Sequence, residues 1–228
     1  MRYNKYIEKG ENVRLKNVKG AKEIIESSPY IIKEPWKYKG KYDELFGNKN
    51  KICLEIGMGK GDFIINMALK NKDINYIGIE MFDSVIVRAV QKLDSLDIPN
   101  LKLIRFDATD IEDIMEKDID TLYLNFSDPW PKNRNEKRRL TSERFLNRYD
   151  KIFKKDRHII QKTDNRKLFE FSLMSYVNHG YIIKDISLDL HSDDYDNVMT
   201  EYEKRFVERG LKIYMVEVVK VDKTLHVK

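Results

Sequence analysis

Three glycines at alternate positions follow a short apolar run, in the segment Glu55-Ile56-Gly57-Met58-Gly59-Lys60-Gly61-Asp62. Because glycine has no Cβ atom, such a turn can adopt positive φ and let a ligand lie against bare backbone. The spacing departs from the G-x-G-x-x-G of dinucleotide-binding folds, since Asp62 stands where the third glycine would be. Glu55 would repel a pyrophosphate but could face a cationic amino-acid tail. The segment therefore favours an adenosine with such a tail over NAD.

Two further acids stand where predicted strands end. Glu80 ends the second predicted strand, where an acid can accept hydrogen bonds from both ribose hydroxyls, and Asp107, followed by Ala108, ends the third, near the expected place of an adenine amino group. The carboxyl ends of parallel strands share one edge of a sheet, so Glu55, Glu80 and Asp107 would converge there. Each acid alone could be a solvated turn residue or a helix cap. Their joint placement favours binding of an adenosyl cofactor.

From residue 51 onward, short β-branched apolar runs alternate with longer amphipathic runs, and these elements must position the acids. The runs typical of strands cover residues 51–56, 75–80, 101–106, 121–126, 158–163, 181–188 and 212–221. The runs typical of helices cover residues 62–70, 84–95, 111–116, 142–154, 166–178 and 201–209. This order predicts an α/β domain over residues 51–228, with a seven-stranded, mostly parallel sheet, helices on both faces and antiparallel pairing at its C-terminal end.

Charge is distributed unevenly along the 228 residues. Residues 1–50 hold 12 Lys and Arg against 7 Asp and Glu, which accounts for the whole net charge of +5. Residues 132–157 form a second basic stretch, with 11 Lys and Arg against 4 acids. We therefore expect a basic N-terminal extension packed on the core domain, and a polyanionic partner, although a Lys-rich surface can also be merely solubilising.

Several classes of protein and site are disfavoured. The single cysteine, Cys53, lies in an apolar run and predicts buried packing rather than a disulfide or a nucleophile. The single cysteine fits a reducing cytoplasm, and no run approaches the ~20 apolar residues of a membrane span, so we expect a soluble, cytoplasmic protein. The sequence leaves the oligomeric state, monomer or homodimer, open. His191 with Asp193, Asp194 and Asp196 matches no ligand spacing, and we expect no metal.

The fourth predicted strand leads into Asn125-Phe126-Ser127-Asp128-Pro129-Trp130-Pro131-Lys132, which resembles the SDPWPK segment of the tRNA (guanine-N7)-methyltransferases. The resemblance spans residues 54–206 and continues in Gly78-Ile79-Glu80, Ser84-Val85-Ile86-Val87-Arg88, Arg138-Arg139-Leu140-Thr141, Thr163-Asp164-Asn165 and Thr200-Glu201-Tyr202-Glu203. It implies a Rossmann-like class I methyltransferase fold. It also implies methyl transfer from S-adenosylmethionine to N7 of guanine 46 in the variable loop of tRNA, giving 7-methylguanosine and S-adenosylhomocysteine.

The resemblance also implies roles for residues. The family's cofactor-contacting acids fall on Glu55, Glu80, Asp107 and Asp128, and its substrate-binding positions on Lys132, Asp164 and the segment from Thr200 to Glu203. The chemistry agrees, because guanine N7 has a lone pair and no hydrogen and needs no general base. Asp128, stiffened by Pro129, could accept hydrogen bonds from guanine N1–H and N2–H₂ and so serve as the catalytic residue that selects guanine.

The remaining residues of these motifs each allow two interpretations. Lys137, Arg138 and Arg139 could contact phosphates or lie in a solvated loop, and Trp130 could stack on a displaced base or pack in the core. Asp164 could cap the next helix, and Thr200 with Glu203 matches a capping box. If that box forms, Glu201 becomes the better candidate for a ligand contact.

Three other functions compete with this one. An enzyme acting on an exocyclic amine would carry a DPPW motif, whereas here the order after Asp-Pro is Trp-Pro. A non-catalytic RNA-binding protein would not need the intact Glu55, Gly57, Gly59 and Asp128. A dehydrogenase fits least well, because the glycine spacing is wrong for NAD.

Overall fold

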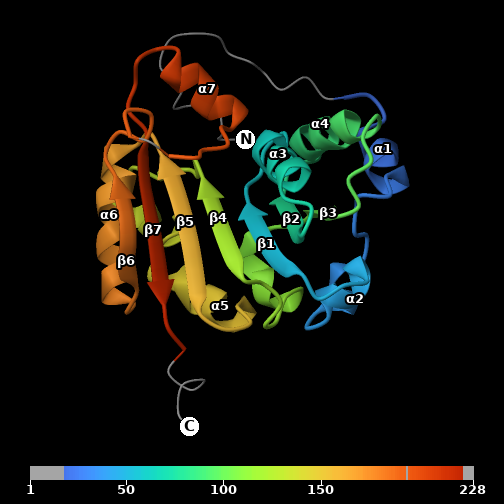
Figure 1. Ribbon diagram of the computed structural model, residues 1–228, viewed down its shortest axis with the longest axis horizontal. Helices are drawn as coiled ribbons and strands as arrows, with labels where there is room; N and C mark the ends of the chain where they lie inside the picture. Colours follow the sequence, from blue (N-terminus) through green and yellow to red (C-terminus); the bar gives the residue numbers. More distant parts are fainter. Residues whose placement is uncertain (1–17, 194, 223–228) are drawn as a thin grey trace.

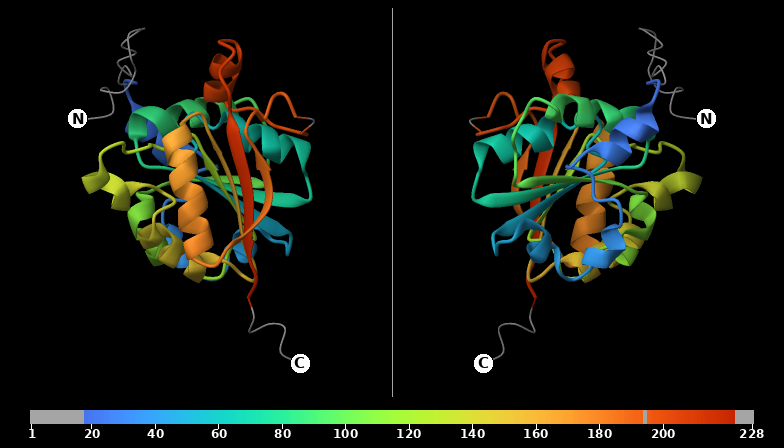
Figure 2. Two further views of the ribbon diagram at one scale, coloured as in Figure 1. Left: turned by 90° about the vertical axis from the view of Figure 1, so that its left-hand side faces the viewer. Right: turned by 90° about the vertical axis from the view of Figure 1, so that its right-hand side faces the viewer.

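A twisted seven-stranded sheet lies between two layers of helices in the computed structural model, which describes residues 18–193 and 195–222 (Figures 1 and 2). The first 17 residues of the predicted basic extension lie outside this range. The strands are β1 (Lys51–Ile56), β2 (Ile74–Glu80), β3 (Leu101–Arg105), β4 (Thr121–Asn125), β5 (Arg157–Thr163), β6 (Ile182–Ser187) and β7 (Tyr214–Lys220). All seven were predicted, with bounds that differ by at most two residues.

The order of the strands is β3-β2-β1-β4-β5-β7-β6. β1 to β5 pair in parallel, and β7 inserts between β5 and β6 and runs antiparallel to both. The predicted mostly parallel sheet with an antiparallel C-terminal strand is confirmed. The strand order reverses between β1 and β4, which run parallel, so the carboxyl ends of these two strands flank the switch point where open α/β sheets bind ligands.

Helices cover both faces of the sheet, as predicted. The helices α3 (Asp62–Lys70), α4 (Asp83–Leu93) and α1 (Ala21–Ser27) pack on one face, in a core cluster that includes Tyr76 and Leu103. The helices α5 (Glu143–Ile152) and α6 (Arg166–Asn178) pack on the other, where Tyr149 and Tyr176 are fully buried. The short helix α7 (Glu201–Val207) stands beside the carboxyl ends of β4 and β5 (Figure 1).

The helix predicted over residues 111–116 is wrong in type and bounds. The chain instead forms the 3₁₀ helix η2 (Ala108–Asp113), with a break in helical dihedral angles at Asp110. Asp107 causes the early start, because its side chain accepts a hydrogen bond from the Thr109 backbone N–H and caps the turn. A second 3₁₀ helix that the sequence did not predict, η3 (Asn133–Arg138), carries the basic cluster that follows the Asp-Pro-Trp-Pro segment.

Residues 18–50 also contain elements without a recognisable sequence period. Besides α1 they form η1 (Pro35–Tyr38) and α2 (Tyr42–Phe46). Ile31 bridges Leu103 at the edge of the sheet, and the ring of Tyr42 is fully buried. The Asp118 carboxylate accepts hydrogen bonds from the backbone N–H groups of Gly40 and Tyr42. The division into an extension over 1–50 and a catalytic domain over 51–228 stays a prediction.

Candidate active site

The loop after β1 contains three glycines, which have two different structural roles. Gly57, Gly59 and Gly61 all have positive φ, between 60° and 79°. A Cβ atom at Gly57 or Gly59 would meet nothing within 4 Å, so these two leave open space beside bare backbone. A Cβ atom at Gly61 would lie 2.9 Å from Cβ of Ala89, so this glycine lets α3 approach α4. The first two glycines are therefore the ones available to a ligand.

Glu55 lies fully buried at the end of β1, and its carboxylate is only half satisfied. Its Oε1 accepts a hydrogen bond of 2.8 Å from Asn125 on β4. Its Oε2, the Asn125 Oδ1 and the Ser127 hydroxyl are buried without a partner among the described residues. Burial raises the pKa of Glu55 from its usual 4.5 to about 7, although Asn125 and the Lys162 ammonium oppose the shift. Orphaned polar atoms of this kind indicate a polar ligand that completes the site.

Of the other three predicted cofactor acids, Glu80 and Asp107 have backbone partners. Glu80 accepts hydrogen bonds from the backbone N–H groups of Gly59, Met81 and Phe82, and so ties the glycine loop to the end of β2. Burial raises its pKa, and these three hydrogen bonds counter the rise. A carboxylate has about four acceptor positions, so one remains for a ribose hydroxyl. Asp107 is exposed and caps η2, with the buried Ala108 beside it.

Asp128 stands in a loop of uncommon backbone conformation at the end of β4. Phe126 and Trp130, two residues to either side of it, have φ values of 51° and 40°, in the left-handed region that favours glycine. The carboxylate is half-buried and accepts no hydrogen bond from any described residue. Burial raises its pKa, and the nearby Arg138 charge opposes the rise. Asp128 is therefore held in place by its loop while its carboxylate stays free for a ligand.

Two arginines hold the Asp128 loop, each in a different way. Arg139 is largely buried, and its guanidinium donates to the backbone carbonyls of Pro129 and Trp130 at 3.1 and 3.2 Å. The exposed Arg138 stacks over the Trp130 ring at 4.2 Å from its centroid. Trp130 is only partly buried, which decides against a core tryptophan. Arg139 thus supports the loop, whereas Arg138 and the Trp130 ring can meet a ligand.

The capping box predicted at the start of α7 is confirmed. The Thr200 hydroxyl accepts from the Glu203 backbone N–H at 2.9 Å, and Glu203 accepts from the Thr200 N–H at 3.2 Å. Glu203 is fully buried, while Glu201 is partly exposed and pairs with Lys60 of the glycine loop at 2.9 Å. The half-exposed Tyr202 packs against the Phe126 ring, 5.1 Å between centroids. The segment from Thr200 to Glu203 therefore adjoins the Asp128 loop.

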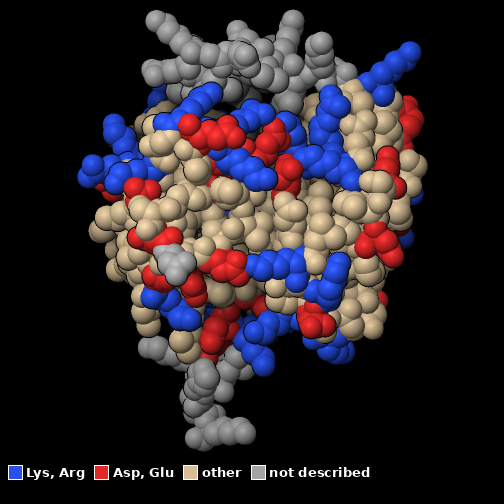
Figure 3. Space-filling model, turned by 45° about the horizontal axis from the view of Figure 1, so that its top comes forward, with Lys and Arg blue, Asp and Glu red and all other residues tan. Residues whose placement is uncertain are grey.

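Asp164 does not cap α6, because Asn165 does so through a hydrogen bond from the Leu168 N–H. The capping interpretation of Asp164 is wrong, and its partly buried carboxylate, whose pKa burial raises, remains for another contact. Lys132 and Lys137 are exposed next to the same edge. In Figure 3 the top of Figure 1, where this edge lies, is turned toward the viewer, and its surface carries many Lys and Arg side chains with acidic ones between them.

The residues set aside at the outset have structural roles. Cys53 is buried and burial raises its thiol pKa to about 12, which confirms buried packing. His191 pairs with Glu203 at 3.1 Å and Asp196 with Lys70, while Asp194 lies outside the described residues. Among the residues described, no group of His, Cys, Asp and Glu could hold a metal, and no helix is long and apolar enough to span a membrane.

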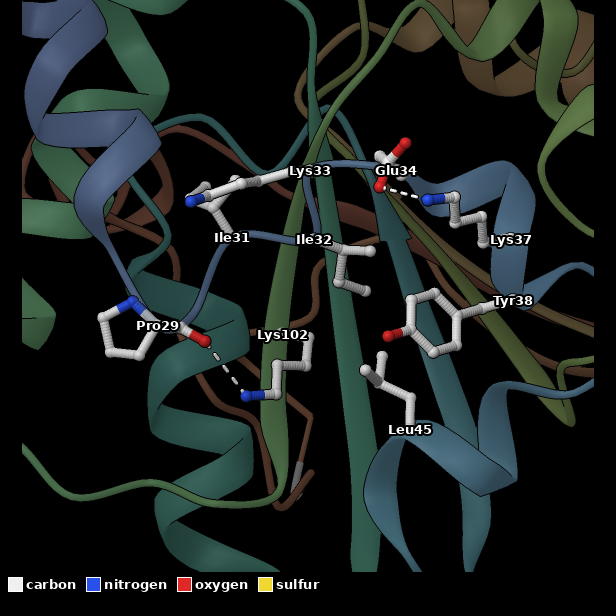
Figure 4. A pocket seen from close by; sticks show the side chains of 9 residues that line it. All are labelled: Pro29, Ile31, Ile32, Lys33, Glu34, Lys37, Tyr38, Leu45 and Lys102. Atoms are coloured by element: carbon white, nitrogen blue, oxygen red, sulfur yellow. Dashed lines mark hydrogen bonds and ion pairs between the residues drawn. The ribbon is translucent and has the colours of Figure 1, made fainter.

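A separate pocket of about 250 Å³ lies along the β3 edge, away from these motifs (Figure 4). Lys102 borders it and donates to the Pro29 carbonyl at 3.1 Å, and Lys37 pairs with Glu34. None of the predicted site residues lines this pocket. The site residues that the sequence predicts therefore lie away from this pocket, at the carboxyl edge of the sheet.

Known proteins resemble this chain over most of its length. A family model described as "Putative methyltransferase" matches residues 49–216. The tRNA (guanine-N(7)-)-methyltransferase of Lachnoclostridium phytofermentans is 49% identical over 205 residues, 89% of this chain and 96% of the relative. That of Bacillus licheniformis is 50% identical over 196 residues, 85% and 92% of the two chains. The solved structure of the 16S rRNA methyltransferase KamB matches with a TM-score of 0.62 at 11% identity, over 80% of this chain and 94% of KamB, which shows a shared fold.

Proposed function

The chain belongs to the tRNA (guanine-N(7)-)-methyltransferase family, and we propose that the site at the carboxyl edge of its sheet methylates N7 of a guanine in tRNA. It is an S-adenosylmethionine-dependent methyltransferase. The base expected from the sequence resemblance is guanine 46 of the variable loop. The observation that carries the proposal is the Asp128 carboxylate, half-buried beside the cofactor acids and without a hydrogen-bond donor among the described residues.

The cofactor would lie over Gly57 and Gly59, where the backbone is bare and space is open. The unpartnered Oε2 of Glu55 supports a place for the cationic methionine end beside it, since a buried carboxylate gains most from a positive partner. Glu80 would accept from the ribose, and Asp107 with Ala108 would meet the adenine. When bound, S-adenosylmethionine supplies a methyl group activated by a positively charged sulfur.

The protein's task in the reaction is to orient the base rather than to remove a proton. Guanine N7 carries its lone pair in the ring plane, so in-line alignment at about 3–3.5 Å is the main requirement. Asp128 would accept from guanine N1–H and N2–H₂, which adenine cannot offer together. The same carboxylate stabilises the positive charge that the base acquires. The Trp130 face, now covered by Arg138, would receive a base taken out of its stack.

The remaining site residues would hold the RNA. Lys132, Lys137 and Arg138 are exposed beside the Asp128 loop and suit phosphate contacts. For Arg139, the hydrogen bonds to Pro129 and Trp130 support a loop-positioning role in addition to the predicted phosphate contact. Asp164, Thr200, Glu201 and Tyr202 border the same edge and would contact the substrate, whereas the buried Glu203 would shape this segment from within.

The catalytic assignment is tested with Asp128→Asn, which keeps the shape of the side chain and removes its charge. We expect turnover on tRNA to fall by about 10²–10³-fold, the usual effect of removing a charge-stabilising group. Isothermal titration should show cofactor affinity within about threefold of the wild type, because Asp128 would then act on the base. Equal losses of affinity and turnover would make Asp128 a cofactor ligand only.

A further inference from the structure

Lys162 is a buried lysine in β5 that no motif singled out. Its side chain is 4% exposed, and its ammonium lies 2.7 Å from Oε2 of the fully buried Glu203. It also donates to Oδ1 of Asn197 at 3.1 Å and to the Val198 carbonyl at 3.0 Å. All three N–H donors of the ammonium are therefore used by residues 197–203, which include the first turn of α7.

Lys162 also contacts the strand β4, which leads to the proposed site. Its backbone carbonyl accepts from the Phe126 N–H at 2.8 Å, and it lies opposite Asn125, the partner of Glu55, in the β4–β5 register. The Phe126 ring in turn packs against Tyr202 of α7. Lys162 thus touches both the strand that delivers Asp128 and the segment that carries Thr200 to Glu203.

Residues 197–203 contain no buried apolar side chain. A cavity of about 220 Å³ lies beside the segment, lined in part by Lys162, Leu190 and residues 195–197. Among the described residues, the apolar cluster on this side has three buried members, Leu190, Ile213 and Met215, with Phe126, Tyr195 and Phe206 partly buried against them. Besides the ring contact between Tyr202 and Phe126, the segment is therefore tied to the sheet by the three polar contacts of the Lys162 ammonium.

We propose that Lys162 is a positioning residue that fixes residues 197–203 against β5, so that Thr200, Glu201 and Tyr202 meet the tRNA in a preset place. The proposal rests on the function proposed above. Burying both charges is costly and exposed ion pairs contribute little, so a fully buried pair at this point serves geometry more than stability. Lys162 itself, at 4% exposure, would touch neither the RNA nor the cofactor.

The test compares Lys162→Met with Lys162→Arg, and with Lys70→Met as a matched control. Lys70 pairs with Asp196 of the same loop, but this ion pair is exposed. For each variant, hydrogen exchange is measured by mass spectrometry, together with the cofactor Kd and the kcat and KM on unmodified tRNA. An error of about 1 Å in a positioned group can cost about 100-fold. We expect Lys162→Met to lower kcat/KM for tRNA about 10- to 100-fold, with a cofactor Kd within about threefold of the wild type.

Hydrogen exchange separates positioning from general destabilisation. In Lys162→Met, exchange should rise in residues 197–203 and stay unchanged in α6, while Lys162→Arg should restore most of the activity because the neighbouring cavity can admit the larger head group. Lys70→Met should match the wild type. Should Lys162→Met fail to fold, Lys162→Met with Glu203→Gln removes both buried charges and keeps a capping side chain, and exchange in 197–203 must still rise.

Uniformly faster exchange in the whole protein, unchanged exchange in residues 197–203, or no rescue by arginine would overturn the inference. A wild-type protein that leaves tRNA unmethylated would refute the proposed function instead. The exchange measurements would still show whether Lys162 holds the segment, so the two failures are distinguishable.

Discussion

The buried carboxyl of Glu55 predicts that cofactor binding depends on pH in a defined window. Desolvation raises its pKa to about 7 in the free protein, so the group is largely protonated in mildly acidic solution. A cationic methionine end placed beside Oε2 would favour the ionised form and lower this pKa again. Binding below pH 7 must then release a proton, and affinity should rise as the pH increases toward 8.

The size of the effect follows from the pKa. At pH 6 about 90% of Glu55 is protonated and binding should be about tenfold weaker than at pH 8, and at pH 5.5 about 30-fold weaker. Stability of the free protein should change in the opposite sense. A carboxyl with a raised folded pKa contributes stability that is present below its unfolded pKa of 4.5 and is lost as the pH rises through 7, on the order of 3 kcal/mol in all.

Isothermal titration of S-adenosylmethionine from pH 5.5 to 8, in two buffers of different ionisation enthalpy, measures both affinity and proton release. Glu55→Gln is the control, because it keeps an acceptor for Asn125 without titrating. The difference between the two proteins isolates Glu55 from the cofactor's own amino group. An identical pH dependence of affinity in wild type and Glu55→Gln would show that ionisation of Glu55 does not control cofactor binding.

Two further predictions concern residues that shape the site. Gly61→Ala should destabilise the protein by about 2–4 kcal/mol, because the residue has positive φ and its new Cβ atom would clash with Ala89. Gly47→Ala, where φ is also positive but the space is open, should cost about 1–2 kcal/mol. Urea unfolding measures both free energies, and equal losses would show that Gly61 is not needed for packing against Ala89. Asn165→Ala should lower stability by about 1 kcal/mol through the lost α6 cap, while Asp164→Ala should leave the urea midpoint unchanged and raise the KM for tRNA; the reverse pattern of midpoints would return the capping role to Asp164.

The elements whose signals are local could be predicted from the sequence. The bounds of β1, α3 and α6 agree with the prediction at both ends, because each combines a clear apolar period with a glycine or asparagine at its boundary. The convergence of the acids followed from the parallel order of the strands. The capping box at Thr200 also carries its whole signal within four residues.

The features that depend on distant partners could not be predicted. α2 begins at Tyr42, which is held by Asp118 from far along the chain, and nothing in its own segment shows this. The choice of Asn165 over Asp164 as the α6 cap depends on one residue of register. In the sequence Lys162 is indistinguishable from an ordinary strand residue, and only the structure shows that its ammonium donates to Glu203 and Asn197.

The proposed activity is measured by transferring labelled methyl groups from S-adenosylmethionine to unmodified tRNA and identifying the product nucleoside by mass spectrometry. A matched tRNA with the guanine at position 46 replaced by adenine serves as the control substrate. We expect 7-methylguanosine, formed only in the tRNA that keeps this guanine. A different methylated nucleoside would contradict the assignment of the base, and no methyl transfer despite measurable cofactor binding would contradict the assignment of the substrate.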